Sequence, residues 1–379
     1  MKNSTAKGSH FLLALAALAL AACGDSAQTA SDTGPAQPMG PLALPAESGP
    51  YMAGHAEDVV IDDARGGRSL PVDIWYPIDD AGDSEFTLYA LQGEAGITSE
   101  LAYRDAAPGG SGVRPLIVFS HGFGGINTQS VPLMEHLATH GYVVISPEHT
   151  GNINGDNSSP DPAADRVPDV TAVIDYMSRR NDSAGDPFEG RVDTARVGVA
   201  GHSFGGFTAT AAATGYDVFA PDPRVVAIMP IAAANSRISD DELRRLTLPA
   251  LFLCGTLDSL LEQQIRSFDL AESSPNLFRV DSVGATHTHF ANICQIGNWL
   301  ISIGITKDTW ASIGASALTG PYEETCEPPA LDINIALRVQ NLYAAAFFGR
   351  YLGGDERYAD YLTTDYAEAN EPDVVFFAK

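Results

Sequence analysis

One serine stands in a glycine-rich turn of the kind that acyl transfer needs. After the apolar run "RVGVA" comes Gly-His-Ser-Phe-Gly (201–205), which fits the pattern G-x-S-x-G. The glycines allow a sharp turn from a strand into a helix, and the turn exposes the serine hydroxyl at the positive end of that helix. The pattern alone is weak, but a predicted strand precedes it and a predicted helix follows. Ser203 is therefore the candidate nucleophile.

A second loop, His-Gly-Phe-Gly-Gly (121–125), follows the apolar run "PLIVFS". Acyl transfer needs two backbone N–H groups that face the developing oxyanion. One belongs to the residue after the nucleophile and one to a loop after an earlier strand. The N–H groups of Phe204 and Phe123 meet this requirement and form the predicted oxyanion hole. We expect His121 to brace this loop by hydrogen bonding rather than to act as a base.

A carboxylate and two histidines follow later strands. Asp258 comes after "ALFLC", where a carboxylate can orient a histidine and stabilise the imidazolium. An acid at this position is also a common helix N-cap, and a helical segment follows, so both roles stay open. After "NLFRVDSV", His287 and His289 compete for the role of base. The order Ser203, Asp258, His287 is the chain order of α/β-hydrolases.

Short apolar runs alternate with segments of helical periodicity along most of the chain, which predicts an α/β fold. The predicted architecture is a mostly parallel, doubly wound sheet with helices on both faces, in one domain that covers residues 55–379. The first two strands form an antiparallel start to the sheet. The carboxyl ends of such strands gather the reacting groups. The predicted strands are 57–61, 70–77, 115–120, 142–147, 196–201, 225–231, 250–255 and 276–283, and the predicted helices are 130–141, 169–180, 207–215 and 332–352.

The bulk composition excludes some classes of function. The 379 residues are 45% hydrophobic, enough for a large core, and carry a formal net charge of −26. Nucleic-acid binding is excluded, because it depends on neutralisation of phosphates by Lys and Arg. No Cys/His spacing resembles a zinc site, and we expect neither a metal nor a cofactor. Nothing in the sequence predicts an oligomeric state.

The N-terminus is typical of an export signal. Lys2 and Lys7 precede the apolar run "FLLALAALAL", which is too short to span a bilayer, and the segment ends in "LAAC". This end resembles a bacterial lipobox, so we expect residues 1–22 to be a signal peptide and Cys23 to be lipidated and membrane-anchored, at the periplasmic face or the cell surface. The alternative is an ordinary signal peptide cut nearby. Residues 23–54, rich in Gly, Pro, Ala and Ser, are predicted to be a flexible tether.

The remaining cysteines lie in the folded part. An exported protein permits disulfides, and we expect Cys294 to pair with Cys326, whereas Cys254 in "ALFLC" is predicted to be a buried free thiol. The segment 290–330 around this pair is unusually apolar. Two interpretations stay open: a lid or acyl-chain wall over the site, or a packed helical pair tied down by the disulfide.

The motifs "FSHGFGG", "GHSFGG" and "HTHFAN" resemble the α/β-hydrolases grouped with plasma-type platelet-activating-factor acetylhydrolase and the bacterial dienelactone-hydrolase-like lipoproteins. The stretch "LATHGYVVISPEHTGN" also resembles bacterial cutinases, and the resemblance covers roughly residues 55 to 300. It implies Ser203 as the nucleophile and His287, rather than His289, as the base. A cutinase-like arrangement implies Asp258 as the acid, because the acetylhydrolase position in "AIMPIAA" holds no carboxylate. The "EH" pair at 148–149 is expected to buttress the site.

Two departures from these families bear on the substrate. Dienelactone hydrolase itself uses a cysteine nucleophile, which this turn lacks. Polyester-degrading cutinases keep a tryptophan after the "AIMP" strand, where this chain has three alanines (232–234), so an aromatic clamp is missing or built differently.

The residues together predict a serine hydrolase of carboxylic esters. The resemblance implies small-molecule or lipid esters with short acyl chains, short-acyl or oxidised phospholipids among them. Alternatives within the same chemistry are a cutinase-like polyester hydrolase and an amidase or peptidase. An alternative of another class is a non-catalytic binding lipoprotein on a hydrolase fold, since a fold does not determine its function.

Overall fold

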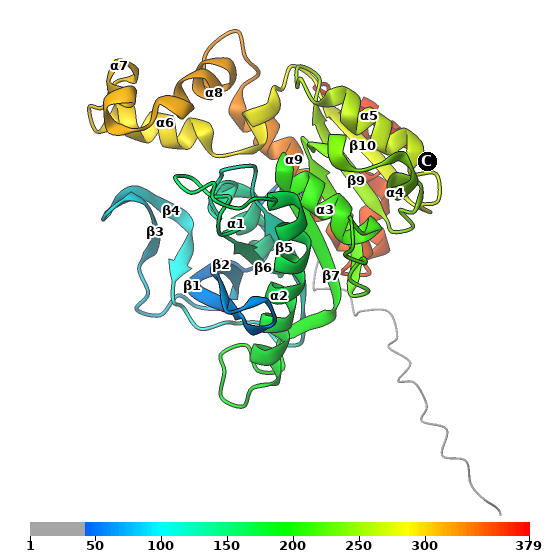
Figure 1. Ribbon diagram of the computed structural model, residues 1–379, viewed down its shortest axis with the longest axis horizontal. Coiled ribbons are helices and arrows are strands. Elements are labelled where there is room, and N and C mark those ends of the chain that lie inside the picture. The colour runs from blue at the N-terminus through cyan, green and yellow to red at the C-terminus, as the bar shows by residue number, and fades with distance from the viewer. Residues whose placement is uncertain (1–41) are drawn as a thin grey trace, which may run out of the picture. The chain divides into compact units, whose positions relative to one another are not determined.

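The structure, a computed structural model, describes residues 42–379, and a large mixed sheet lies at its centre (Figure 1). Six neighbouring strands of this sheet run parallel, which confirms the predicted α/β architecture. Their carboxyl ends meet at one edge, where the candidate residues follow the strands. These strands are β6 (Val143–Pro147), β5 (Arg114–Ser120), β7 (Val192–His202), β8 (Val225–Ile231), β9 (Ala250–Gly255) and β10 (Leu277–Ser282), in their order across the sheet.

Further strands complete the sheet on both sides, and all of their pairings but one are antiparallel. β1 (Met52–Asp62) and β2 (Arg68–Ile78) form the predicted antiparallel start, and β2 pairs with β6. Three strands at the edges were not predicted: β3 (Phe86–Gln92), β4 (Ala95–Arg104) and β11 (Val374–Ala378). They are half-exposed, so their sequences lack the continuous apolar run of a buried parallel strand.

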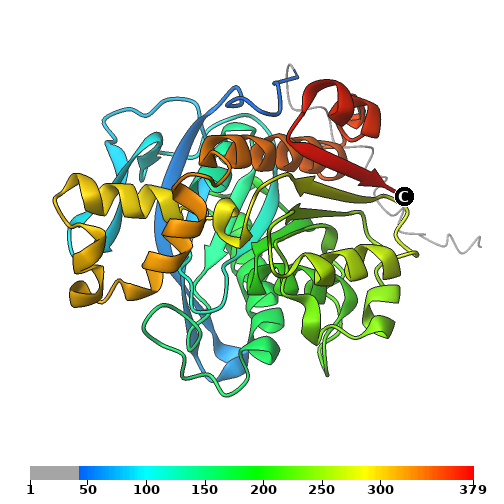
Figure 2. The same cartoon turned by 90° about the horizontal axis from the view of Figure 1, so that it is seen from above.

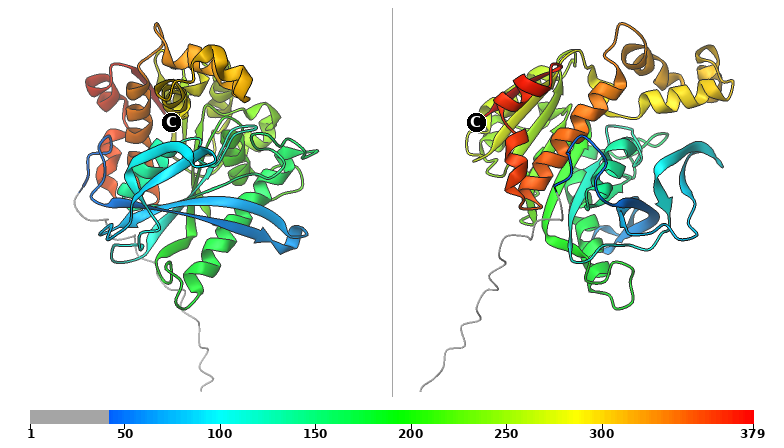
Figure 3. Two further views of the ribbon diagram at one scale, coloured as in Figure 1. Left: turned by 90° about the vertical axis from the view of Figure 1, so that its left-hand side faces the viewer. Right: turned by 180° about the vertical axis from the view of Figure 1, so that it is seen from behind.

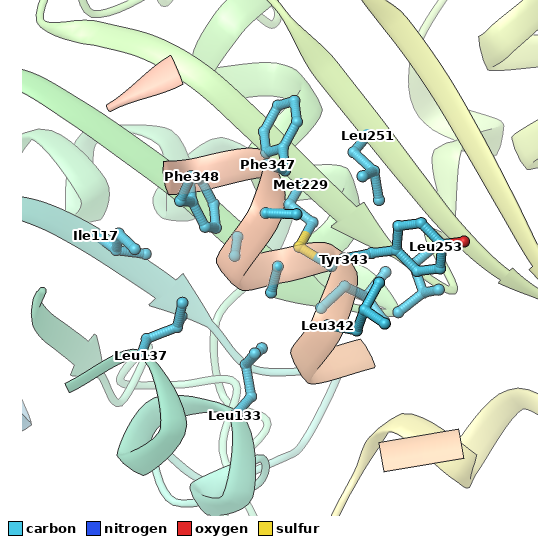
Figure 4. Packing of buried hydrophobic residues seen from close by; sticks show 14 of the residues in the cluster. Ile117, Leu133, Leu137, Met229, Leu251, Leu253, Leu342, Tyr343, Phe347 and Phe348 are labelled. Atoms are coloured by element: carbon cyan, nitrogen blue, oxygen red, sulfur yellow. The ribbon is translucent and has the colours of Figure 1, made fainter. Parts of the chain in front are cut away.

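Helices cover both faces of the sheet. On one face, α1 and α9 pack on the strands through residues such as Leu133, Leu342 and Phe347 (Figure 4). On the opposite face lie α2, α3 and α5, as Figure 2 shows from above. The helices are α1 (Val131–Thr139), α2 (Pro162–Asp182), α3 (Phe204–Thr214), α4 (Asp240–Arg244), α5 (Leu261–Leu270), α6 (Ile293–Ser302), α7 (Lys307–Trp310), α8 (Ser316–Cys326), α9 (Ile333–Tyr351) and α10 (Thr364–Asn370).

Helix α2 begins seven residues earlier than predicted. The predicted helix began at Asp169, directly after Pro168, and a proline in a helix interior removes a hydrogen bond. In the structure the helix continues through Pro168, with Pro162 in its first turn and Asp161 as its cap. This extension places Arg166 one turn before Asp169, on a helical face that packs against the site.

The predicted tether ended too late along the chain. β1 begins at Met52, and the residues before it already bind the folded body. The Tyr51 N–H donates to Thr139 O (3.1 Å), and the carbonyl of Pro45 lies 2.9 Å from His136 Nε2. The predicted signal peptide (1–22) and Cys23 lie outside the described residues. Within residues 42–379, no helix is both long and apolar enough to cross a membrane.

The segment after β10 forms a separate group of helices, α6 to α8. Cys294 and Cys326 form a disulfide that joins α6 to α8, and a small cluster of Leu300, Trp310 and Tyr322 fills the space between the helices. Figure 3 shows this group on the same flank as the β3–β4 hairpin, and α6 contacts β4. The segment is thus packed and cross-linked, and its role as a wall for acyl chains stays a prediction.

Candidate active site

Ser203 occupies the sharp turn between β7 and α3. Its backbone has φ 59° and ψ −114°, a conformation that costs energy for any residue with a side chain and that persists where the surroundings enforce it. The close approach of strand and helix explains the flanking glycines. A Cβ atom on Gly205 would lie 1.7 Å from Ser120 O, and one on Gly201 would lie 2.4 Å from the Gly205 oxygen. The turn therefore admits only glycine on both sides of the serine.

The structure brings Ser203, His287 and Asp258 together. His287 Nε2 lies 2.9 Å from Ser203 Oγ, and His287 Nδ1 lies 3.0 and 3.1 Å from the two oxygens of Asp258. The Asp258 side chain is fully buried and also accepts from the Leu260 N–H (2.8 Å) in the turn before α5. The N-cap of α5 is Leu260, which has no side-chain cap, so the structure places Asp258 as the histidine partner and not as the helix cap. Because Asp258 holds the Nδ1 proton, the Nε2 lone pair faces the serine hydroxyl, the arrangement of a general base.

The second histidine candidate has a different environment. His289 lies in the same short helix, η3 (His287–Phe290), but its ring is buried. Its Nδ1 accepts from the Thr286 N–H (2.8 Å), which leaves the proton on Nε2 to be donated to Leu331 O (3.1 Å). Burial lowers the pKa of His289. Both ring nitrogens are occupied within its own surroundings, so this residue holds the loop in place.

The backbone N–H groups of Phe123 and Phe204, which form the predicted oxyanion hole, have no hydrogen-bond acceptor in the described part of the chain, and the carbonyl that precedes each of them is hydrogen-bonded. Within residues 42–379, neither the Phe123 nor the Phe204 N–H donates a hydrogen bond. The preceding Gly122 O lies 3.0 Å from Arg166 Nη2 and 2.7 Å from His121 Nδ1. The Ser203 O accepts from the Ala234 N–H (2.9 Å). Since a trans peptide is planar, a fixed carbonyl directs the next N–H the opposite way, and both donors are left available for an oxyanion.

A buried polar network supports the loop of residues 121–125, which carries Phe123, on its buried side. Arg166, fully buried, donates to His121 O (2.5 Å) and Asn152 Oδ1 (2.7 Å). His149 joins Ser120 Oγ to Asp169, each at 2.8 Å. His121 and His149 therefore brace the loop, as the sequence predicted.

The charges in this network follow from burial. Burial lowers the pKa of Arg166 to about 9, and burial together with the nearby Arg166 lowers the pKa of His149 to about 4. Burial alone would raise the pKa of Asp169, but hydrogen bonds from His149 and Arg68 hold it below its usual range. Sequence reasoning missed Arg166 and Asp169. Two opposite charges three residues apart, on an otherwise apolar helix face, were the available signal.

Large apolar side chains are exposed on the loops that carry an oxyanion donor and the acid. Phe123 is 62% exposed and Leu257 is 66% exposed, and the Phe123 ring lies 5.7 Å from that of Phe204. Ala232 and Ala233, which follow β8, are fully buried and present no surface to a ligand. The large exposed apolar side chains therefore lie on the loops that carry Phe123 and Asp258, whereas of the three alanines after β8 only Ala234 is partly exposed.

The remaining candidates have structural surroundings. Cys254 is a buried free thiol, as its apolar neighbours indicate, and its Sγ lies 3.1 Å from Gln264 Oε1. Burial raises its pKa, which disfavours the reactive thiolate. In the described part of the chain, no group of three or more His, Cys, Asp or Glu side chains is arranged to hold a metal ion.

Comparison with known proteins places these features in a family. A family model described as PET hydrolase-like matches residues 99–302, more than half of the chain. A chlorophyllase of Arabidopsis thaliana is 29% identical over 143 residues, which covers 36% of this chain and 42% of that relative. A cutinase of Thermobifida alba is 26% identical over 203 residues, which covers 51% of this chain and 61% of the cutinase. The chain thus spans less than two thirds of the length of these curated relatives.

The fold is that of a solved esterase. A ferulic acid esterase from Streptomyces cinnamoneus matches with a TM-score of 0.62 over 86% of this chain and 96% of the esterase, at 22% sequence identity. This likeness shows the α/β-hydrolase fold. The predicted cutinase-like features agree with the relatives, and the resemblance to the acetylhydrolase and to dienelactone hydrolase stays a prediction.

Proposed function

The chain belongs to the PET hydrolase-like family, and we propose that it is a serine hydrolase of carboxylic esters that works through an acyl-enzyme. The observation that carries this proposal is the continuous hydrogen-bonded series from Ser203 Oγ through His287 to Asp258. Membership of a family with cutinase and chlorophyllase relatives supports an ester substrate.

The proposed reaction follows from the position of each group. Ser203 Oγ attacks the ester carbonyl, and its proton passes to His287 Nε2 while Asp258 stabilises the imidazolium. The N–H groups of Phe123 and Phe204 bind the oxyanion of the tetrahedral intermediate. His287 then protonates the leaving alcohol as the C–O bond breaks. Water, deprotonated by His287, hydrolyses the acyl-enzyme and restores the serine.

Two substrate classes are supported by separate observations. We infer a preference for short acyl chains, including those of short-acyl or oxidised phospholipids, from the motifs around Ser203. A second candidate is hydrolysis of a polyester. The family match supports it, and so do Phe123 and Leu257, whose exposed apolar side chains suit an uncharged chain that stays in contact with the surface.

A covalent probe tests the chemistry before any substrate is chosen. A fluorophosphonate label is expected to attach to the folded protein and to be lost in Ser203→Ala. Absence of labelling on folded protein would favour the non-catalytic binding alternative. Rates on p-nitrophenyl esters of increasing chain length, beside a polyester film, a short-acyl phospholipid and a matched amide, then separate the candidates. Best turnover on long chains would contradict the short-chain preference.

We also infer that the chain is exported and anchored through a lipid on Cys23. The disulfide between Cys294 and Cys326 supports an oxidising compartment, since such bonds persist outside the cytosol. Detergent-free fractionation of expressing bacteria is the test. The wild-type chain should stay with membranes, and Cys23→Ser should appear in the soluble exported fraction. Equal distribution of the two would contradict the anchor.

A further inference from the structure

The residue before the nucleophile, His202, takes no part in the series from serine to aspartate, yet its buried ring joins two loops of the site. His202 Nε2 lies 2.8 Å from His287 O, and His202 Nδ1 lies 2.6 Å from Gln129 Nε2. Gln129 Oε1 in turn accepts from the Gly122 N–H at 2.8 Å. Three hydrogen bonds therefore connect the loop that carries Phe123 to the carbonyl of His287.

The direction of every proton in this series is determined by its two ends. The Gly122 N–H can only donate, so Gln129 presents Oε1 to it and turns its amide N–H toward His202. His202 Nδ1 must then accept, which leaves the single proton of the neutral ring on Nε2. That proton is donated to His287 O, which can only accept. A flipped amide or the other tautomer would place two donors or two acceptors face to face.

Neighbouring bonds tie the same two segments together. The Asn292 N–H donates to Gln129 O (2.8 Å), Asn292 Nδ2 donates to Thr128 O (2.9 Å), and Ser130 Oγ donates to Phe290 O (3.0 Å). The backbone at 128–130 and the backbone just after His287 thus form one unit. The Gln129 side chain extends from this unit to both catalytic loops.

The Gly122 peptides are consequently held from two sides. Arg166 binds the carbonyls of His121 and Gly122 from the buried side, and Gln129 binds the Gly122 N–H from the other. Because each peptide group is planar, the orientation of the Phe123 N–H depends on how the peptide groups on either side of Gly122 are held. The carbonyl held by His202 belongs to His287 itself, the residue whose ring must face Ser203.

We propose that Gln129 and His202 are positioning residues, which together set the placement of the oxyanion donor at Phe123 relative to the imidazole of His287. Both groups act on one tetrahedral centre, the imidazole on the hydroxyl and the N–H on the oxygen. A displacement of about 1 Å between them lowers the rate by up to about 100-fold. The inference rests on the proposed function, because it concerns the geometry of that same reaction.

A double-mutant cycle measures whether the two side chains act as one unit. Gln129→Met and His202→Phe remove the hydrogen bonds at nearly constant volume. Each is expected to lower kcat about 10- to 100-fold with a much smaller change in KM. The kcat of the double variant should lie within about threefold of the kcat of the less active single variant, because either change alone already breaks the series of hydrogen bonds. The proposal would be overturned if the kcat of the double variant fell by the product of the two single-variant losses, or if only KM changed.

Matched controls are available in the same chain. Gln295 is half-buried like Gln129, and within residues 42–379 its Oε1 has no hydrogen-bond partner. His140 is buried like His202 but binds the carbonyl of Glu47 far from Ser203. Gln295→Met and His140→Phe should keep kcat within about twofold. A loss in these controls equal to that in the test variants would also overturn the proposal.

A third variant, Gln129→Glu, keeps the side-chain volume and the hydrogen bond from the Gly122 N–H. Its second carboxylate oxygen, however, places an acceptor opposite His202 Nδ1, where glutamine has a donor. His202 then completes the series only when it is protonated on both nitrogens. The titratable groups that face it are His287, whose ring lies 4.8 Å away, and Asp258 beyond it. As the pH rises and His202 loses its second proton, we expect the kcat of this variant to fall, so that its pH profile has an alkaline limb that the wild-type profile lacks.

The pH profile of Gln129→Glu decides the matter if Gln129→Met and His202→Phe do not fold, as judged by their circular dichroism melting curves. An alkaline limb is the expected result, and a profile parallel to that of the wild type overturns the proposal. Failure of the proposed function is a separate outcome, because the wild type itself would then show neither fluorophosphonate labelling nor ester turnover.

Discussion

The loops around Ser203 and the helices α6 to α8 are neighbours held in place by different means. The catalytic loops follow strands of the central sheet, and hydrogen bonds between buried groups join them to one another. The helical group is held by one disulfide, a cluster of three buried side chains, ion pairs of Lys307 and the contact of α6 with β4, while several of its isoleucines are at least 40% exposed. Local stability follows the density of buried contacts. We therefore expect this group to open without unfolding the sheet.

The two regions meet at Thr325, the residue before Cys326. Its hydroxyl lies 2.6 Å from Thr288 Oγ1 and 3.1 Å from Thr286 Oγ1, on either side of His287. The end of α8 is thus attached to the histidine loop through side-chain hydroxyls, whereas α6 follows that loop directly in the chain. The comparison implies that changes in the catalytic loops act on rate, and that changes in α6 to α8 act on local stability and only weakly on rate.

The largest expected effect separates the two histidines of the loop. His287→Ala should lower kcat by about 10⁴-fold or more, because the serine loses its base. His289→Ala should keep much of the turnover but melt at a lower temperature, since it removes a buried ring that is bonded on both nitrogens. Turnover on p-nitrophenyl acetate and thermal melting of both variants are the measurements. The reverse pattern of activity would contradict the assignment of His287 as base.

The second effect concerns the disulfide. Replacing both Cys294 and Cys326 by Ala removes a cross-link over a separation of 32 residues, which constrains the unfolded chain by about 3 to 4 kcal/mol. We expect amide exchange to accelerate in residues 293–330, while β7 and α9 keep their protection. The value of kcat on a small ester should fall less than about tenfold. Loss of protection throughout the sheet would contradict a locally opening region.

The third effect is a dependence of stability on pH that arises away from the site. Burial and the adjacent His140 lower the pKa of His136 in α1 to about 3, whereas an unfolded histidine titrates near 6.5. Between these values the unfolded chain binds more protons, so stability is lost as the pH falls below about 6.5. Between pH 6.5 and pH 4.5, His136 alone lowers the free energy of unfolding by about 2 to 3 kcal/mol.

The variant His136→Gln isolates that contribution. Glutamine keeps an N–H donor for the carbonyl of Pro45 but does not titrate. Urea unfolding between pH 7.5 and 4.5 should show a shallower acid slope for the variant, by about one proton. At pH 7.5 the two chains should differ only by a constant packing offset. An unchanged slope would mean that His136 is protonated in the folded chain.

The sequence predicted the parts of the fold that local patterns specify. Parallel strands buried on both faces, such as β8 and β9, are continuous apolar runs, and their ends predicted Ser203, Asp258 and His287 as neighbours. The β3–β4 hairpin was missed because its strands are half-exposed and lack such runs. β11 is short and pairs with β10 from about 100 residues away, so its existence depends on a distant partner.

The supporting residues of the site were harder to predict for a related reason. Gln129, Arg166 and His202 contact partners 7 to 85 positions away in the sequence, and no local spacing distinguishes them from surface residues. Asp258 shows the same limit in another form. Its sequence context fits a helix cap and a triad acid equally, and only the fold, in which α5 begins three residues later, separates the two roles.

The smallest expected effect concerns the apolar side chains at the surface of the site. Phe123→Ala removes a ring that is 62% exposed but keeps the backbone N–H that is proposed to bind the oxyanion. KM for an apolar ester should rise about 3- to 10-fold, since about 1 kcal/mol of apolar contact is lost, while kcat and the melting temperature stay nearly constant. Arg357→Ala, on a distant exposed segment, is the matched control and should leave KM unchanged. A fall in kcat with constant KM would show that the ring aims the backbone donor instead of contacting the substrate.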